Sequence, residues 1–191
     1  MTVGSQLAPS LRYAIGTVEP VTPGLLPAPT PCRAWDLGML LAHLCDSVTA
    51  IAEGITGGEV CLDAAAGVPA DPRSAFLAQA GLLLARCEGT TGGGTILVGG
   101  CPMAADMLTA IGAVEIAVHG WDVSQACGAR QPIPEPLAAA LLPVARALMC
   151  DNERTLLFGP PRPAGAAASA SDQLAAFLGR TPAPLLIPGW F

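Results

Sequence analysis

The fold of this chain is decided by one stretch, Ile111-Gly112-Ala113-Val114-Glu115-Ile116-Ala117-Val118-His119-Gly120-Trp121-Asp122, inside a long apolar segment. Its polar side chains Glu115, His119 and Asp122 follow the spacing i, i+4, i+7. On an α-helix this spacing places all three on one face, about one turn apart. Unpaired buried charge is costly. A carboxylate and an imidazole on successive turns of an apolar helix therefore need a partner, and a metal ion is one such partner.

A second contribution comes from upstream, in the apolar run Leu40-Leu41-Ala42-His43-Leu44. The chain has 2 histidines, His43 and His119, and each lies in a helical pattern rather than in a loop. With Glu115 they would give two nitrogens and one oxygen, a ligand set that suits zinc and also nickel, iron or cobalt. Three protein ligands leave a position open for water or substrate, as in catalytic metal sites.

The same residues also fit a site without a metal. A single buried histidine is more often a hydrogen-bonded core residue than a ligand. Glu115 and His119, four residues apart, fit an intrahelical hydrogen bond equally well. Spacing alone therefore leaves two interpretations open, a metal centre and a buried hydrogen-bond network.

Length and composition indicate one globular domain, residues 1–191. Hydrophobic residues make up 52% of the chain and the mean hydropathy is +0.53. No run of roughly eighteen uninterrupted apolar residues occurs, so we expect no membrane span. The N-terminus lacks the pattern of a signal peptide, and we expect the protein in the cytoplasm. A surface this apolar is compatible with a homodimer.

The charge pattern argues against nucleic acid as a partner. The net charge is −6, and all 9 basic residues are arginines scattered along the chain. Such a chain has no basic surface for phosphates. The glycine-rich segment 89–100 lacks the lysine motif of a phosphate-binding loop, and we do not expect it to bind a nucleotide.

The 7 cysteines indicate a reducing compartment. No two of them form a C-x-x-C pair, and their apolar surroundings predict small buried side chains. Cys45 lies two residues from His43, which turns it to another helix face. A nucleophilic cysteine stays an alternative. The residues are Cys32, Cys45, Cys61, Cys87, Cys101, Cys127 and Cys150.

Apolar periodicity and capping residues predict an all-α fold of four main helices with short C-terminal helical additions. The core bundle covers about residues 5–128, and a C-terminal extension covers about 129–191. A loop is expected at 59–70, and a short extended segment around 95–98 crosses the bundle end. Trp35 and Trp121 are expected to pack in the core rather than to bind substrate. The predicted helices are 7–18, 36–57, 72–88, 102–127, 136–150 and 171–178.

Three motifs, in this order, resemble one known group of proteins: Thr30-Pro31-Cys32-Arg33-Ala34-Trp35, Ala42-His43-Leu44 and His119-Gly120-Trp121-Asp122. The chain is similar to the DinB/YfiT-like metalloprotein superfamily. Within it, the resemblance is to the branch with the N-terminal domain of mycothiol-dependent maleylpyruvate isomerase. The tail segments 157–160 and 173–180 resemble a short metal-binding subfamily of this group.

The resemblance implies a four-helix bundle with a divalent metal near one end. The family's ligands are a histidine of the second helix and an E-x-x-x-H pair of a later one, which correspond to His43, Glu115 and His119. In the isomerase, an aspartate three residues beyond the last ligand is associated with binding of the thiol cofactor. Asp122 occupies this place. It would either orient the thiol or accept a hydrogen bond from a ligand.

Two hypotheses about function follow. In the first, the protein is an enzyme in which the metal, most simply zinc, activates a thiol of the mycothiol type as thiolate for S-transfer or addition–elimination isomerisation of a small electrophile. A related version replaces the thiol with metal-bound water and gives a hydrolase. In the second, the bundle is a non-catalytic protein that binds a metal or a small molecule for sequestration or resistance.

Overall fold

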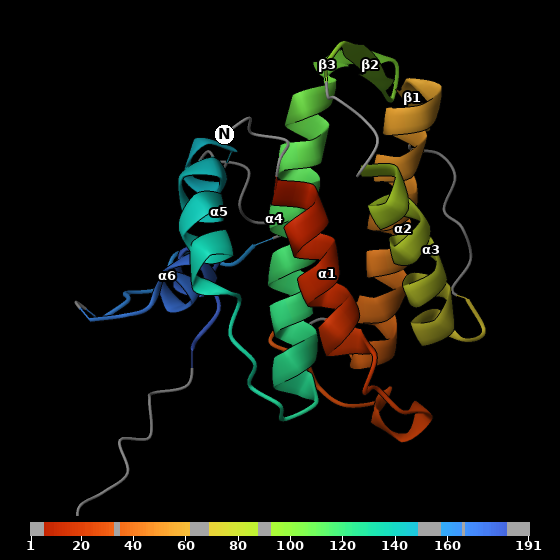
Figure 1. The fold of residues 1–191 in the computed structure, drawn as a ribbon. Helices are drawn as coiled ribbons and strands as arrows, with labels where there is room; N and C mark the ends of the chain where they lie inside the picture. Colours follow the sequence, from red (N-terminus) through yellow and green to blue (C-terminus); the bar gives the residue numbers. More distant parts are fainter. Residues whose placement is uncertain are drawn as a thin grey trace, which may run out of the picture.

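Four helices form the body of the molecule: α1 (Leu7–Val18), α2 (Leu37–Gly57), α3 (Pro72–Cys87) and α4 (Ala105–Ala126). The computed structural model describes residues 6–32, 35–61, 69–87, 93–148, 158–165 and 167–182. Around the bundle the order is α1, α4, α2, α3, and each helix contacts the next, with α3 closing the ring against α1 (Figure 1). The predicted all-α class is confirmed.

Helix α2 begins and ends where its sequence predicts. The Oδ1 atom of Asp36 accepts a 2.8 Å hydrogen bond from the backbone N–H of Met39, so Asp36 is the N-cap. Gly58 ends the helix with a left-handed φ of 72°, which glycine adopts without strain. The face of α2 turned to the core carries Leu37, Leu40, Leu41, Leu44, Val48 and Ile51, all buried.

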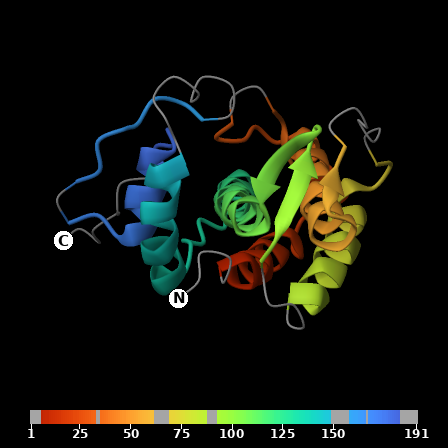
Figure 2. The same ribbon diagram turned by 90° about the horizontal axis from the view of Figure 1, so that it is seen from above.

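Helix α4 is buried along most of its length because it contacts other helices on several sides. It packs against α1, α2 and α5 (Glu135–Leu148), and Figure 2 shows it end-on in the middle of the molecule. Its contact with α1 depends on Gly120, where a Cβ atom would lie 3.1 Å from Cα of Ala14. Burial on several sides explains why the 111–122 stretch is apolar around most of the helix.

A small sheet covers the end of the bundle at which α4 begins (Figures 1 and 2). The strand order is β1 (Glu59–Val60), β2 (Thr95–Val98), β3 (Cys101–Ala104). Strand β1 pairs with β2 in parallel, and β2 pairs with β3 in the antiparallel direction. The extended segment expected at 95–98 is therefore β2. The loop expected from residue 59 is wrong at its start, which is strand β1; residues 62–68 lie outside the described part of the chain.

The predicted start of the central helix is also wrong. Pro102, expected in the first helical turn, lies in β3, and α4 begins at Ala105. Gly99 and Gly100 make a two-residue turn with φ values of 54° and 78°, a conformation that reverses an antiparallel pair. Since β3 is an edge strand, the missing N–H of proline is tolerated there.

The C-terminal additions pack on the outer side of α4. Helix α5 includes Pro143 and contacts both α4 and α6 (Ala170–Phe177). Residues 149 and 150, the predicted end of α5, lie outside the described residues. Helix α6 ends at Phe177, one residue before the predicted end at 178. Gly179 follows it with a φ of 83°.

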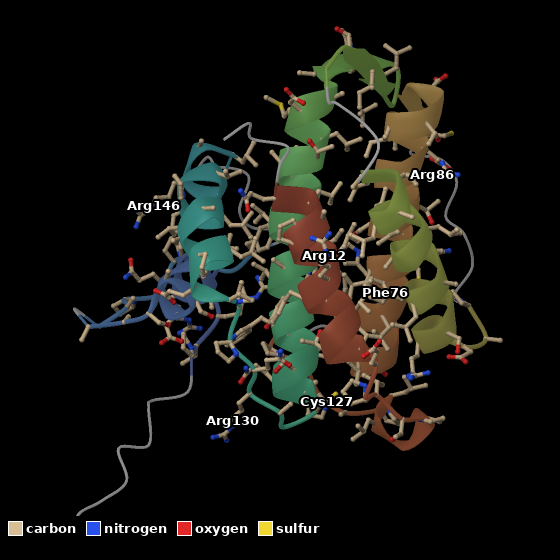
Figure 3. The ribbon with its side chains drawn as sticks, in the orientation of Figure 1. Arg12, Phe76, Arg86, Cys127, Arg130 and Arg146 are labelled. Atoms are coloured by element: carbon tan, nitrogen blue, oxygen red, sulfur yellow. The ribbon has the colours of Figure 1, made fainter. Side chains whose placement is uncertain are left out.

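Most large apolar side chains lie in one core, which includes Phe76 of α3 (Figure 3). By length and composition alone α2 would be long enough to cross a membrane, a test that the core helices of soluble proteins also pass. The expectation that the cysteines are buried holds for Cys45 but is wrong for Cys61, which follows β1, and for Cys101 in β3; both are exposed. Cys150 lies outside the described residues.

Candidate metal centre

Three side chains from two neighbouring helices converge in the half of the bundle opposite the sheet. His43 comes from the second turn of α2, and Glu115 and His119 come from successive turns of α4. The Oε1 atom of Glu115 lies 2.8 Å from Nε2 of His43 and 3.1 Å from Nε2 of His119. The structure thus brings the three candidate ligands together around one carboxylate oxygen.

The arrangement fits a divalent ion. One donor atom from each of the three residues lies within 4.8 Å of both others. Two ligands of a tetrahedral zinc ion, each about 2.0–2.1 Å from the metal, are about 3.3 Å apart. The observed distances of 2.8 and 3.1 Å are those of hydrogen bonds, so each histidine nitrogen would move away from Oε1 of Glu115 by only a few tenths of an ångström to hold an ion.

Charge at the centre is stabilised from within. Burial alone would raise the pKa of Glu115, but hydrogen bonds and attraction from His119 and His43 outweigh it, and the pKa lies well below its usual range. Burial would lower the pKa of His119, yet hydrogen bonds to Asp122 and Glu115 raise it to about 9. Without an ion, a carboxylate and an imidazolium neutralise each other here.

Asp122 supports the centre from behind. It is 0% exposed, and its Oδ2 atom lies 2.9 Å from Nδ1 of His119. This contact fixes the ring so that Nε2 faces Glu115, the usual support for a ligating histidine. The sequence left two roles open for Asp122, to orient a thiol or to accept a hydrogen bond from a ligand. Because its side chain has no exposed surface, the structure favours the second role.

Arg180 is a member of the site that sequence reasoning missed. It is 5% exposed, and its Nε and Nη2 atoms donate to Oδ1 and Oδ2 of Asp122 at 3.2 and 2.6 Å. Attraction to Arg180 is the main cause that lowers the pKa of Asp122 against the opposing effect of burial. One signal in the sequence could have indicated such a cation: Asp122 lies in an apolar helix that contains no arginine. This signal does not say which of the chain's nine arginines pairs with it.

The chain after α6 positions Arg180. Its backbone N–H donates to the carbonyl oxygen of Ala175, and its Nη1 donates to that of Leu178, each at 2.9 Å. Gly179 lies so close to the backbone of Gly159 that a Cβ atom would approach to 2.7 Å. The guanidinium also lies over the ring of Phe158, 5.2 Å from its centroid. The extension therefore completes the support of a site whose ligands belong to the bundle.

Cys32 and Cys45 are poor nucleophiles. Burial, the largest effect, raises the pKa of Cys32, although attraction to Arg180 opposes it. Burial and the charge of Asp46 raise the pKa of Cys45 to about 11, and its thiol faces the carbonyl oxygen of Pro72 at 3.5 Å. Both side chains are neutral thiols at neutral pH, whereas the thiolate is the reactive form.

Comparison with known proteins agrees with this geometry. The model of a family described as the mycothiol maleylpyruvate isomerase N-terminal domain matches residues 7–124. The chain belongs to this family. The family is part of the DinB/YfiT-like superfamily. The match covers α1, α2, α3, α4 as far as Ser124, and all three candidate ligands.

Two relatives in Mycobacterium tuberculosis are similar over most of their length. They are named "Uncharacterized protein MT0763" (strain CDC 1551 / Oshkosh) and "Uncharacterized protein Rv0738" (strain ATCC 25618 / H37Rv). Each is 27% identical to this chain over 168 residues, which cover 82% of this chain and 85% of the relative. No solved structure matches the chain.

Proposed function

We propose that this protein is a divalent-metal-dependent enzyme that joins a low-molecular-weight thiol of the mycothiol type to a small electrophilic substrate. The reaction would be S-transfer or an addition–elimination isomerisation. The observation that carries the proposal is the convergence of His43, Glu115 and His119 at one carboxylate oxygen. The family description, which names mycothiol and an isomerase, supports the choice of thiol chemistry.

Each residue has a defined role in this proposal. His43, Glu115 and His119 would hold the ion, zinc most simply, with nickel, iron or cobalt as alternatives for the same donors. A bound divalent cation lowers the pKa of a coordinated thiol and presents it as thiolate. Asp122 acts through His119: with both oxygens engaged by His119 and Arg180, it orients the ligand rather than the thiol.

The chain's own thiols favour an external nucleophile. Cys32 is the described cysteine whose pKa is affected by the charges of the site, those of Arg180, Asp122 and Glu115. Burial is the largest effect, and it raises the pKa of Cys32 and keeps the thiol neutral. A reaction that needs a thiolate would therefore take it from a second substrate rather than from the protein. Since such thiols are reduced in the cytoplasm, the protein would act there, on a small molecule and without nucleic acid or membrane as partner. A homodimer is compatible with this proposal.

The first experiment measures the metal content of the purified protein by elemental analysis, beside His43→Ala and Glu115→Ala. Glu53→Ala, which removes an exposed acid of the same helix α2, is the matched control. We expect about one equivalent of divalent metal in the wild type and the control, and its loss in both ligand variants. Circular dichroism of each variant checks that its helices are intact.

Turnover is then tested by incubating the metal-loaded protein with an electrophile, with and without a low-molecular-weight thiol. Thiol-dependent loss of the electrophile that disappears in His43→Ala supports the proposal. Tight binding without turnover would instead identify a sequestration or resistance protein, and turnover without thiol would identify a hydrolase. A wild type that takes up no zinc, nickel, iron or cobalt would reduce the three residues to a hydrogen-bond network.

A further inference from the structure

We propose that Trp35 is a positioning residue of the metal centre, because its indole ring holds His43 in the orientation in which it binds the ion. The inference rests on the proposed metal site but not on the thiol chemistry. It assigns to Trp35 a role beyond the core packing expected from the sequence. Its consequence is that the affinity and the coordination geometry of the ion depend on an aromatic side chain that is not a ligand.

The two candidate histidine ligands are supported unequally. His119 is 2% exposed and is held at both ring nitrogens, by Asp122 at Nδ1 and by Glu115 at Nε2. The side chain of His43 is 26% exposed. In the described part of the chain, its single hydrogen bond joins Nε2 to Glu115. When both of these atoms bind an ion, this hydrogen bond is given up, and no described hydrogen bond then orients the ring.

The ring of Trp35 lies where this support is missing. Its centroid is 4.6 Å from that of His43 and 6.0 Å from that of His119, tilted by 43° to each. The two imidazoles meet edge to face, 5.0 Å apart at 86°. These separations are those of favourable aromatic pairs. The three rings therefore form a cluster in which Trp35 limits the rotation of His43 about its side-chain bonds.

Trp35 is itself held in place by contacts that do not involve the metal ligands. The hydroxyl oxygen of Thr30 lies 2.9 Å from the carbonyl oxygen of Cys32 and 2.8 Å from that of Trp35, so its single O–H is shared between them, and it accepts from the N–H of Cys32 at 3.1 Å. The N–H of Trp35 donates to Cys32 O at 2.8 Å. The next residue, Asp36, caps the helix that carries His43. The indole and the imidazole thus belong to one connected, preformed unit.

The size of the effect follows from the contact. An aromatic pair of this geometry is worth about two- to twelve-fold in an equilibrium constant, and loss of a residue that supports a metal ligand costs about 10- to 100-fold in affinity. We expect Trp35→Leu to weaken metal binding about 10-fold. Trp35→Phe keeps a ring against His43, so its affinity falls only about two-fold.

The test uses the metal alone, Co²⁺, whose visible absorption reports on its ligands. Its dissociation constant and spectrum are measured for the full-length wild type, Trp35→Leu, Trp35→Phe and Trp121→Phe. Trp121 is the matched control: it is a buried tryptophan of α4, 4% exposed. We expect a raised dissociation constant and an altered spectrum in Trp35→Leu, near-normal values in Trp35→Phe, and no change in Trp121→Phe.

Two results would overturn the inference, and they differ from each other. If the wild type binds Co²⁺ and Trp35→Leu binds it equally well with the same spectrum, Trp35 is only a packing residue while the metal site stands. If the wild type binds no Co²⁺, both proposals are wrong. Should Trp35→Leu fail to fold, Trp35→Ile carries the same comparison, since it also removes the ring beside His43 while keeping an apolar side chain that cannot bind the ion.

Discussion

The buried ion pair between Asp122 and Arg180 gives the strongest prediction about stability. Both side chains are almost without exposed surface, and two hydrogen bonds of 2.6 and 3.2 Å join them. Arg180→Met keeps most of the apolar volume but leaves the carboxylate of Asp122 buried with His119 as its remaining described side-chain partner. Removing one member of a buried pair costs about 3–5 kcal/mol, because the other charge is left without compensation.

Urea unfolding followed by circular dichroism measures this cost. With an m-value of about 2 kcal/mol/M, the midpoint of Arg180→Met falls by about 1.5–2.5 M. The control is Arg130→Met, at an exposed arginine near the lower end of α4 (Figure 3), where we expect a change within about 0.5 kcal/mol. A loss below about 1 kcal/mol in Arg180→Met would refute the reasoning, since the pair would then be hydrated.

The double variant and the pH dependence test the same cause. Asp122→Leu combined with Arg180→Met removes both charges, and we expect it to recover much of the lost stability. The pKa of Asp122 is lowered in the folded protein. Its contribution is therefore present above the unfolded pKa of about 4 and is lost as pH falls through the folded value. The difference between wild type and Arg180→Met should shrink in acid.

Four further predictions concern the metal, the pH dependence of stability and two helical glycines. The pKa of His119 is raised to about 9, so protons compete with metal below that pH; competition titrations should show an apparent affinity that rises from pH 6 and levels off near pH 9. In the metal-free protein, the same protonated ring contributes stability that is complete below pH 6.5 and lost as pH rises through about 9, which thermal melts at several pH values measure. Gly120→Ala should destabilise by about 1–3 kcal/mol, because its methyl group meets the backbone of Ala14. Gly81→Ala, a helical glycine with open space around its Cβ position, should stabilise by about 0.5–1 kcal/mol.

The local part of the site could be inferred from sequence because helix geometry fixes it. Residues three and four apart share a helix face, so Glu115, His119 and Asp122 had to lie together wherever the helix packed. His43 could be added because it is the other histidine of the chain. That His43 faces α4 depends on how α2 packs, and the buried leucines of α2 determine this packing.

The part that could not be inferred depends on contacts between distant residues. Arg180 is 58 positions from Asp122 in sequence and follows a proline- and glycine-rich segment. Periodicity does not extend across such a segment, and any of nine arginines could have supplied the cation. Trp35 is a similar case: its ring contacts His43 only because the Thr30 turn and the cap of α2 hold it there.

Of the sheet, β2 was expected as an extended segment; β1 and β3 were missed because strands this short give no readable period. β1 has 2 residues, and β2 and β3 have 4 each. A proline followed by an apolar run is typical of a helix start, and this rule placed Pro102 in a helix. The two glycines before it gave the better indication, since consecutive residues with positive φ favour a tight hairpin.

The charges assembled at the centre favour an anionic partner for the ion. Glu115 and Asp122 contribute two negative charges and Arg180 one positive charge, and ligating histidines are neutral. A divalent ion among them leaves one net positive charge in a mostly buried site, where uncompensated charge is costly. A thiolate or a hydroxide at the open position would remove it, whereas a neutral ligand would not. The position of Arg180 therefore favours an anionic ligand on the ion, and the proposed thiolate is one such ligand.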